Sequence, residues 1–264
     1  MNILLTNDDG LAADGLQVAY KALVAQGHQV TACAPDRERS AHSQSVTIGQ
    51  PLGAQATTMP DGAIGYAISG TPADCSRLGF TTLAPPPLDL VISGVNNDSN
   101  LGYDANYSGT VAAALEAAGQ GLSALAVSVE RSDHYDWATV AEIVVEAVQR
   151  FPGWEIPKGV MVNLNIPAII SDPRWVWTAI NPTPAPDSYL KLQAYEKGCS
   201  QYTRLRQEEN CPATDDSDLA LFRAGRITLS PIVPVATYQP ALKRLRNAHQ
   251  DDNTSGTLRS QKSL

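Results

Sequence analysis

The chain lacks several features that define common protein classes. Cationic residues are few: 19 Lys and Arg stand against 27 Asp and Glu, giving a net charge of -8 and a pI of about 4.9. This balance argues against a basic nucleic-acid-binding face and against attraction to anionic lipid. No apolar run is long enough to span a bilayer, so we expect no membrane partner. There is no GxGxxG fingerprint near the first glycines, which weakens a dinucleotide-binding interpretation.

Cysteine is also scarce, with four residues and no CxxC pair. Cys33 and Cys75 lie in apolar segments and are expected to be buried thiols. Cys199 and Cys211 could pair across a loop, but the N-terminus shows no signal peptide, and we expect a cytoplasmic chain in which such a disulfide is the weaker interpretation.

What is present is the composition of an ordinary globular protein. Hydrophobic residues make up 43% of the 264 positions and charged residues 17%, which argues against disorder. The length suits one α/β domain with an appendage.

Apolar runs and helical periodicities alternate through the first two thirds of the chain. The pattern predicts strands at 3–6, 29–34, 88–93, 123–129 and 160–166, and helices at 16–25, 71–83, 108–118 and 137–151. Such alternation is typical of an α/β fold: a three-layer, Rossmann-like, doubly wound and mostly parallel sheet with right-handed crossovers.

The regularity fades after Pro167, and a polar segment rich in proline and tyrosine covers 181–218. We expect it to form a protruding arm or hairpin, followed by a strand at 226–230 and a helix at about 240–248. The predicted organisation is a catalytic core at 1–180, an oligomerisation region at 181–248 whose C-terminal helix is exchanged between subunits, and a disordered tail at 249–264.

Unusual polar runs follow three of the predicted strands, at 7–10, 34–43 and 93–102. Parallel strands place their carboxyl ends at one edge of a sheet, so these runs are expected to converge there. The first run contains the adjacent carboxylates Asp8 and Asp9 directly after a buried strand. Burying two carboxylates costs free energy unless a cation accompanies them, and a divalent metal ion with oxygen ligands suits the position.

A fourth element is the start of the helix predicted at 108–118. Ser108 is a good N-cap, Gly109 allows a ligand to approach the backbone, and Thr110 adds a hydroxyl. Free N–H groups at a helix N-terminus attract anions, so a phosphate is the natural ligand. Each of these residues could equally serve only as a turn or a cap, and their combination is what favours a site.

These motifs together resemble the SurE family of metal-dependent 5'/3'-nucleotidases. The matching segments are ILLTNDDG at 3–10, APDRERS at 34–40, GTPADC at 70–75, SGVN and NLG within 93–102, and YSGTVAAALEA at 107–117. The similarity extends over most of 1–166 and resumes around 214–234. The chain departs from the family at Ala41 and Asp98, where glycine is usual.

The resemblance implies the chemistry of the site. It implies one Mg²⁺ or Mn²⁺ per subunit, held by Asp8, Asp9, Ser40 and Asn96, with Asp8, Asp9 and Asn96 catalytic and with Asn7, Gly94, Ser108, Gly109 and Thr110 binding substrate. Carboxylate, hydroxyl and carboxamide oxygens are ligands that suit these ions. The implied activity is hydrolysis of nucleoside monophosphates by metal-activated water, in a homodimer or homotetramer. Asp9 is the better candidate to orient that water.

Three alternatives remain open. The chain could be a phosphatase for another small phosphoester or a short polyphosphate. It could form a covalent aspartyl-phosphate, although such enzymes usually separate their two acids by one residue. It could also be a nucleotide-binding module without catalysis.

Overall fold

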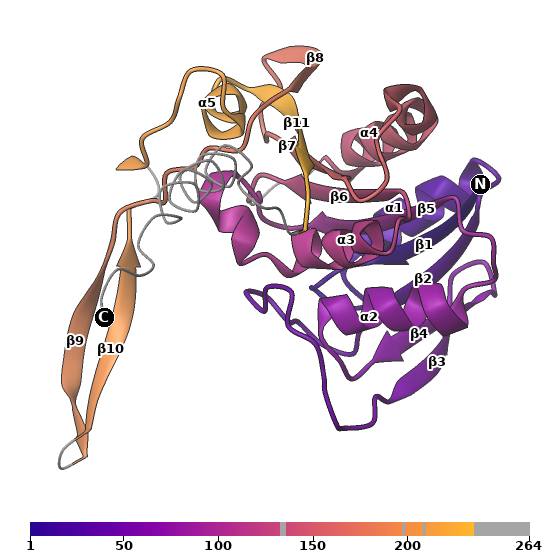
Figure 1. Ribbon diagram of the computed structural model, residues 1–264, viewed down its shortest axis with the longest axis horizontal. Coiled ribbons are helices and arrows are strands. Elements are labelled where there is room, and N and C mark those ends of the chain that lie inside the picture. The colour runs from indigo at the N-terminus through magenta and orange to yellow at the C-terminus, as the bar shows by residue number, and fades with distance from the viewer. Residues whose placement is uncertain (133–135, 197–198, 208–209, 235–264) are drawn as a thin grey trace, which may run out of the picture. The chain divides into compact units, whose positions relative to one another are not determined.

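The structure is a computed structural model that describes residues 1–132, 136–196, 199–207 and 210–234. Met1–Pro234 form one compact unit (Figure 1). The helix predicted at 240–248 and the tail predicted at 249–264 lie outside the described residues. None of the helices in the described ranges combines the length and the apolar character needed to cross a bilayer.

The described residues build a nine-stranded, mostly parallel sheet in the order β3-β4-β2-β1-β5-β6-β7-β11-β8. Its strands are β1 Asn2–Thr6, β2 Gln29–Pro35, β3 Ala54–Thr58, β4 Ile64–Ile68, β5 Leu90–Asn96, β6 Ala124–Val129, β7 Met161–Ile166, β8 Asp172–Trp177 and β11 Arg226–Ile232. Only the pairs β3–β4 and β11–β7 are antiparallel in this sheet. The predicted doubly wound α/β fold is confirmed.

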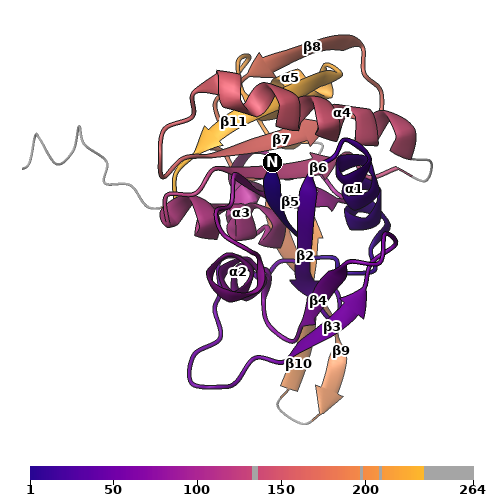
Figure 2. The same cartoon turned by 90° about the vertical axis from the view of Figure 1, so that its right-hand side faces the viewer.

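Helices cover both faces of the sheet (Figure 2). α1 Asp14–Ala25 and α4 Trp137–Arg150 pack on one face, and α2 Pro72–Leu78 and α3 Gly109–Gly119 on the other. Short helical segments follow several elements: η1 Gly79–Leu83, η2 Gly102–Asn106, η3 Phe151–Trp154 and α5 Asp218–Arg223. The three layers therefore match the expected architecture.

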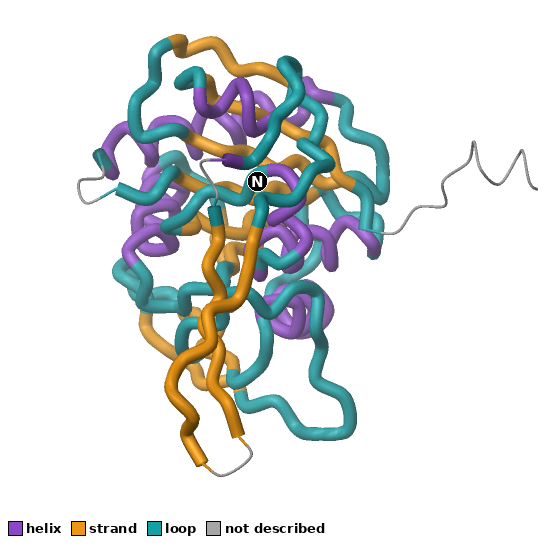
Figure 3. The backbone as a smooth tube through the Cα atoms, turned by 90° about the vertical axis from the view of Figure 1, so that its left-hand side faces the viewer, coloured by secondary structure: helices purple, strands orange, loops and turns teal. Residues whose placement is uncertain are grey.

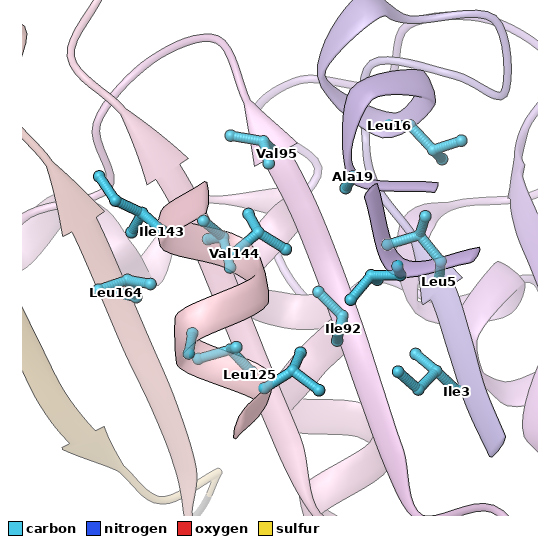
Figure 4. Close-up of a cluster of buried hydrophobic side chains, with 14 of the residues drawn as sticks. Ile3, Leu5, Leu16, Ala19, Ile92, Val95, Leu125, Ile143, Val144 and Leu164 are labelled. Carbon is cyan, nitrogen blue, oxygen red and sulfur yellow. The ribbon is translucent and has the colours of Figure 1, made fainter. Parts of the chain in front are cut away.

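The central strands are buried on both faces, which explains their continuous apolar runs. Side chains alternate along β1, so Ile3 and Leu5 join the cluster beneath α1 and α4, whereas Leu4 joins the one beneath α2 and α3. Figure 4 shows the first cluster, in which Leu16 of α1 and Val144 of α4 lie against the sheet. This packing fixes β1 and β5, whose carboxyl ends carry the polar runs.

The start of α2 is held by a reciprocal pair of capping hydrogen bonds. Thr71 caps α2, its side chain accepts from the Asp74 N–H, and the Asp74 carboxylate accepts from the Thr71 N–H in return. Pro72 occupies the first turn. The predicted helix at 71–83 is divided, because α2 ends at Leu78 and the chain continues as the π-helical turn η1.

Three strands were not predicted: β3, β4 and β8. β3 is an edge strand whose five side chains are all exposed, so it carries no apolar alternation. β4 contains Gly65, and β8, the opposite edge strand, contains Pro173. Glycine and proline weaken a strand signal and are tolerated at edges.

The polar segment predicted as an arm contains an antiparallel hairpin of β9 Asp187–Glu196 and β10 Cys199–Arg206. It projects from the sheet and helices (Figures 1 and 3). The chain then returns through α5 and β11, so the arm is an insertion between elements of the core. The cysteines are all free thiols, with Cys211 buried and Cys199 exposed.

Candidate active site

The site lies where the strand order reverses. β1 pairs with β2 on one side and with β5 on the other, so the loops after β1 and β5 flank a crevice at the carboxyl edge. Asp8, Asp9, Ser40, Asn96 and Ser108 line one cavity there, of about 1530 Å³. The structure thus brings together residues from all four polar segments that the sequence singled out.

Asp8 is a deeply buried acid in the wall of the cavity. Its side chain is 4% exposed, and the Thr110 hydroxyl donates to its Oδ1 at 2.5 Å. Burial raises the pKa of Asp8 to about 6, with a smaller rise from Asp9, while the Thr110 hydrogen bond opposes the shift. Among the described residues, no Lys or Arg lies within ion-pair distance of Asp8. The carboxylate therefore lacks the positive charge that its burial calls for.

Asp9 lies beside Asp8 and is partly buried. Burial raises its pKa, an Asn97 backbone hydrogen bond lowers it, Glu38 and Asp98 raise it, and Arg131 lowers it. The carboxylates of Glu38 and Asp98, from two other loops, thus disfavour a negative charge on Asp9. A cation in the cavity would offset this repulsion.

Asn96 and Ser40 offer oxygen atoms beside the two carboxylates. The Asn96 Nδ2 donates to the Asp98 carbonyl at 2.6 Å, which leaves Oδ1 as the atom able to ligate a cation. The Ser40 hydroxyl donates to Glu38 Oε1 at 2.8 Å, so the lone pairs of its oxygen are the remaining ligand positions.

The donor set is oxygen-only and fits a hard divalent ion. Within the described ranges, no group of three or more His, Cys, Asp and Glu side chains could hold a metal. A site here therefore depends on Ser40 and Asn96 in addition to the two aspartates. Two carboxylates with neutral hydroxyl and carboxamide oxygens suit Mg²⁺ or Mn²⁺ better than a soft, thiolate-seeking metal.

The loop after β2 is tied to this site by backbone hydrogen bonds. The Arg39 N–H donates to the Asp8 carbonyl at 2.7 Å, and the Ser43 N–H donates to the Tyr107 carbonyl at 3.1 Å. Ala41 between them has a φ of 58°, in the left-handed region that favours glycine over residues with a Cβ. Ser40 is thereby held next to the aspartates, with Ala41 strained in place.

The start of α3 closes the other side. Ser108 caps the helix, accepting from the Val111 N–H at 3.1 Å, and lines the cavity. Gly109 packs directly on Asp8, because a Cβ at this position would lie 2.7 Å from the Asp8 Cβ. Thr110 is fully buried and holds Asp8. Of these three predicted phosphate ligands, only Ser108 is among the cavity's lining residues.

Two further residues predicted to bind substrate occupy supporting positions. The Asn7 side chain exchanges two hydrogen bonds with the Gly10 backbone, each 3.0 Å, and so shapes the turn that carries the aspartates. Gly94 has a φ of 139°, and a Cβ there would lie 2.3 Å from the Val127 carbonyl oxygen. The contacts that Asn7 and Gly94 make in the structure are therefore with other residues of the protein.

The sequence analysis missed a buried amide network under the loop after β5. The Asn100 N–H donates to Asn165 Oδ1 and its Nδ2 to Ser128, each at 2.8 Å, while Asn163 Nδ2 donates to the Asn100 carbonyl at 2.8 Å. Asn163 and Asn165 are fully buried in β7. Two asparagines alternating within an apolar strand were the signal that could have revealed them.

Asp218 was also missed. It is fully buried at the start of α5 and accepts from three backbone N–H groups, those of Gly102, Asn181 and Leu219, at 2.7–2.8 Å. Burial raises its pKa, and these backbone hydrogen bonds oppose the rise. One carboxylate therefore ties the loop after β5 to the first residue of the arm segment.

Comparisons with known proteins agree on one family. The family described as "Survival protein SurE" matches residues 3–184. A protein named 5'-nucleotidase SurE from Kosmotoga olearia is 33% identical over 96% of this chain and all of its own length. One of the same name from Pelotomaculum thermopropionicum is 42% identical over 63% of this chain and 64% of its own. The crystal structure of the SurE protein from Aquifex aeolicus superposes with a TM-score of 0.78, at 27% identity over 94% of this chain and 99% of that one.

Proposed function

This chain belongs to the SurE family, and from that membership and its site we propose that it is a divalent-metal-dependent phosphomonoesterase that hydrolyses nucleoside monophosphates to nucleoside and phosphate. The name of the relatives, 5'-nucleotidase, supports the proposed reaction. The environment of Asp8 supports a bound metal ion, because this residue is only 4% exposed, has no cationic partner among the described residues and has a pKa raised to about 6.

The metal would be held by Asp8, Asp9, Ser40 and Asn96. When bound, a Mg²⁺ or Mn²⁺ ion lowers the pKa of a water molecule and offsets negative charge on the phosphoryl group. Asp8 is fixed by Thr110 and Gly109 from behind, and Asn96 by the Asp98 carbonyl, so their oxygens are preorganised.

The remaining groups would position substrate and water. Asp9 is more exposed than Asp8, and its carboxylate is the group that orients the attacking water and accepts its proton. Ser108 lies at the cavity wall beneath the first turn of α3, where free N–H groups favour a phosphate. Thr110, Asn7 and Gly94 hold the turn and strands that carry these groups.

Phosphate release from a panel of nucleoside monophosphates, with Mg²⁺, with Mn²⁺ and with EDTA, tests the proposal. We expect release with either metal and a loss of at least about 100-fold in EDTA, because metal ions supply several kcal/mol of transition-state stabilisation. Release that is unchanged in EDTA would reject the metal-dependent reaction.

The same panel separates the alternatives. Nucleotide binding with no release under any metal would favour a binding module. Release from a short polyphosphate or another phosphoester, but not from nucleotides, would redirect the substrate. A phosphorylated protein trapped during turnover would favour an aspartyl-phosphate intermediate.

We propose also that the chain forms a homodimer or homotetramer through its arm. Large apolar side chains are exposed on β9 and β10: Tyr189, Leu190, Leu192, Tyr202 and Leu205. A two-stranded hairpin is marginally stable alone, so packing against another subunit would stabilise it. Light scattering on the full chain is expected to give a dimer or tetramer, and a monomer at micromolar concentration would contradict this.

A further inference from the structure

The cavity is a poor environment for an anionic substrate. Carboxylates outnumber arginines seven to three among the described residues that line it. A nucleoside monophosphate brings a phosphate dianion, and one divalent ion does not offset all of these charges. An additional cation near the phosphate would therefore strengthen substrate binding.

The three arginines differ in how firmly they are engaged. Arg206 is hydrogen-bonded to Asp104 on η2, and Arg223 donates to the Cys211 carbonyl at 2.9 Å. Arg131, just after β6, pairs with Asp98 at 3.0 Å. The Arg131 side chain is 76% exposed, against 21% for Arg206.

The Arg131–Asp98 pair sits beside the proposed metal ligands. Asp98 is two residues from Asn96, and both Arg131 and Asp98 line the cavity that contains Asp8 and Asp9. The charge of Arg131 also acts on the Asp9 carboxyl, lowering a pKa that burial raises. Arg131 is thus close to the place where a substrate phosphate would meet the metal.

The Arg131–Asp98 ion pair can be replaced by an ion pair between Arg131 and a phosphate. Both side chains are more than half exposed, and exposed ion pairs of this kind contribute little to stability. A phosphate offers more negative charge and bidentate acceptor oxygens, so it competes well for a guanidinium.

We propose that Arg131 binds the substrate phosphate, and that Asp98 holds the Arg131 guanidinium at the cavity mouth until the phosphate replaces it. This inference rests on the proposed function for the identity of the phosphate. Asp98 has two effects: it places Arg131 near the site, and it competes with the substrate for it. Arg131 would therefore set substrate affinity, whereas Asp9 and the metal would set the rate of the chemical step.

The test measures kcat and KM for a nucleoside monophosphate with Mn²⁺, and the Kd of inorganic phosphate for the Mn²⁺-loaded protein by calorimetry. Arg131→Ala is expected to raise KM and the phosphate Kd by about tenfold, the effect of one charged hydrogen bond in partial contact with solvent. We expect kcat to change by no more than about twofold and the Mn²⁺ affinity not to weaken. Asp98→Gly is expected to lower KM by about threefold, and to lose that effect when combined with Arg131→Ala.

Arg37→Ala is the matched control, because Arg37 is also exposed and paired with an aspartate, Asp36, but does not line the cavity. Equal KM and phosphate Kd in Arg131→Ala and Arg37→Ala would overturn the inference. If wild-type protein releases no phosphate from nucleotides, the proposed function fails. The phosphate Kd still decides about Arg131 in that case.

Discussion

Asp8→Asn is expected to abolish phosphate release and, at the same time, to stabilise the metal-free fold near neutral pH. Both results follow from burial of the carboxylate, which raises the pKa of Asp8 from 3.8 to about 6. Asparagine keeps a side-chain oxygen for the Thr110 hydroxyl but carries no charge. The variant therefore loses a charged metal ligand and also the cost of burying that charge.

The sign of the stability effect depends on pH. The folded protein holds the Asp8 proton up to a higher pH than the unfolded chain does, so the folded state loses stability as pH rises from about 4 to 6. At pH 7 the full cost is present, on the order of 3 kcal/mol at about 1.4 kcal/mol per pKa unit. Urea unfolding in EDTA should show Asp8→Asn more stable than wild type at pH 7, and equal to it near pH 4.

Asp14→Asn provides the control for this comparison. Asp14 lines the same cavity at the start of α1 but is exposed, so the same change of charge removes no burial cost. We expect activity within a few-fold of wild type and a small loss of stability from the helix N-terminus. If metal-free Asp8→Asn is no more stable than wild type at pH 7, the charge on the buried Asp8 carboxylate does not destabilise the fold.

The central sheet and the convergence of the polar runs could be predicted because both depend on local patterns and on one topological rule. β1, β5 and β7 are buried on both faces and read as apolar runs, and parallel strands bring their carboxyl ends to one edge. The edge strands β3 and β8 were not predicted, because an edge strand does not need a buried apolar face and its side chains can be those of an exposed segment.

The site was predicted less completely than the fold, since its support comes from long-range contacts. Thr110 was expected to face a phosphate, but it lies 102 residues from Asp8 in sequence and donates to it. Asp218 reaches Gly102 across 116 residues. No local spacing encodes such pairs, because which polar atoms become buried together is decided only when the layers pack.

Gly109→Ala is expected to reduce kcat/KM by about 100-fold or more while leaving most of the fold intact. The added methyl group would lie 2.7 Å from the Asp8 Cβ and 2.9 Å from the Pro72 Cγ, closer than real Cβ contacts allow. Either Asp8 or the first turn of α3 must move. Overpacking of this kind typically costs about 1–3 kcal/mol of stability, whereas a shift of about 1 Å in a positioned group can cost a factor of about 100 in rate.

The matched control lies in the same helix. At Gly119, at the end of α3, an alanine Cβ would meet only the Pro234 Cγ among the described residues, at 3.7 Å, which is an ordinary contact. Gly119→Ala should keep wild-type activity and gain up to about 1 kcal/mol, since alanine limits the unfolded chain more than glycine does. Circular dichroism, urea unfolding and Mn²⁺ titration of both variants separate the effects. We expect Gly109→Ala to be folded, to bind Mn²⁺ more weakly and to turn over slowly. A folded variant with normal Mn²⁺ affinity and normal turnover would mean that the contact between α3 and Asp8 does not position the site.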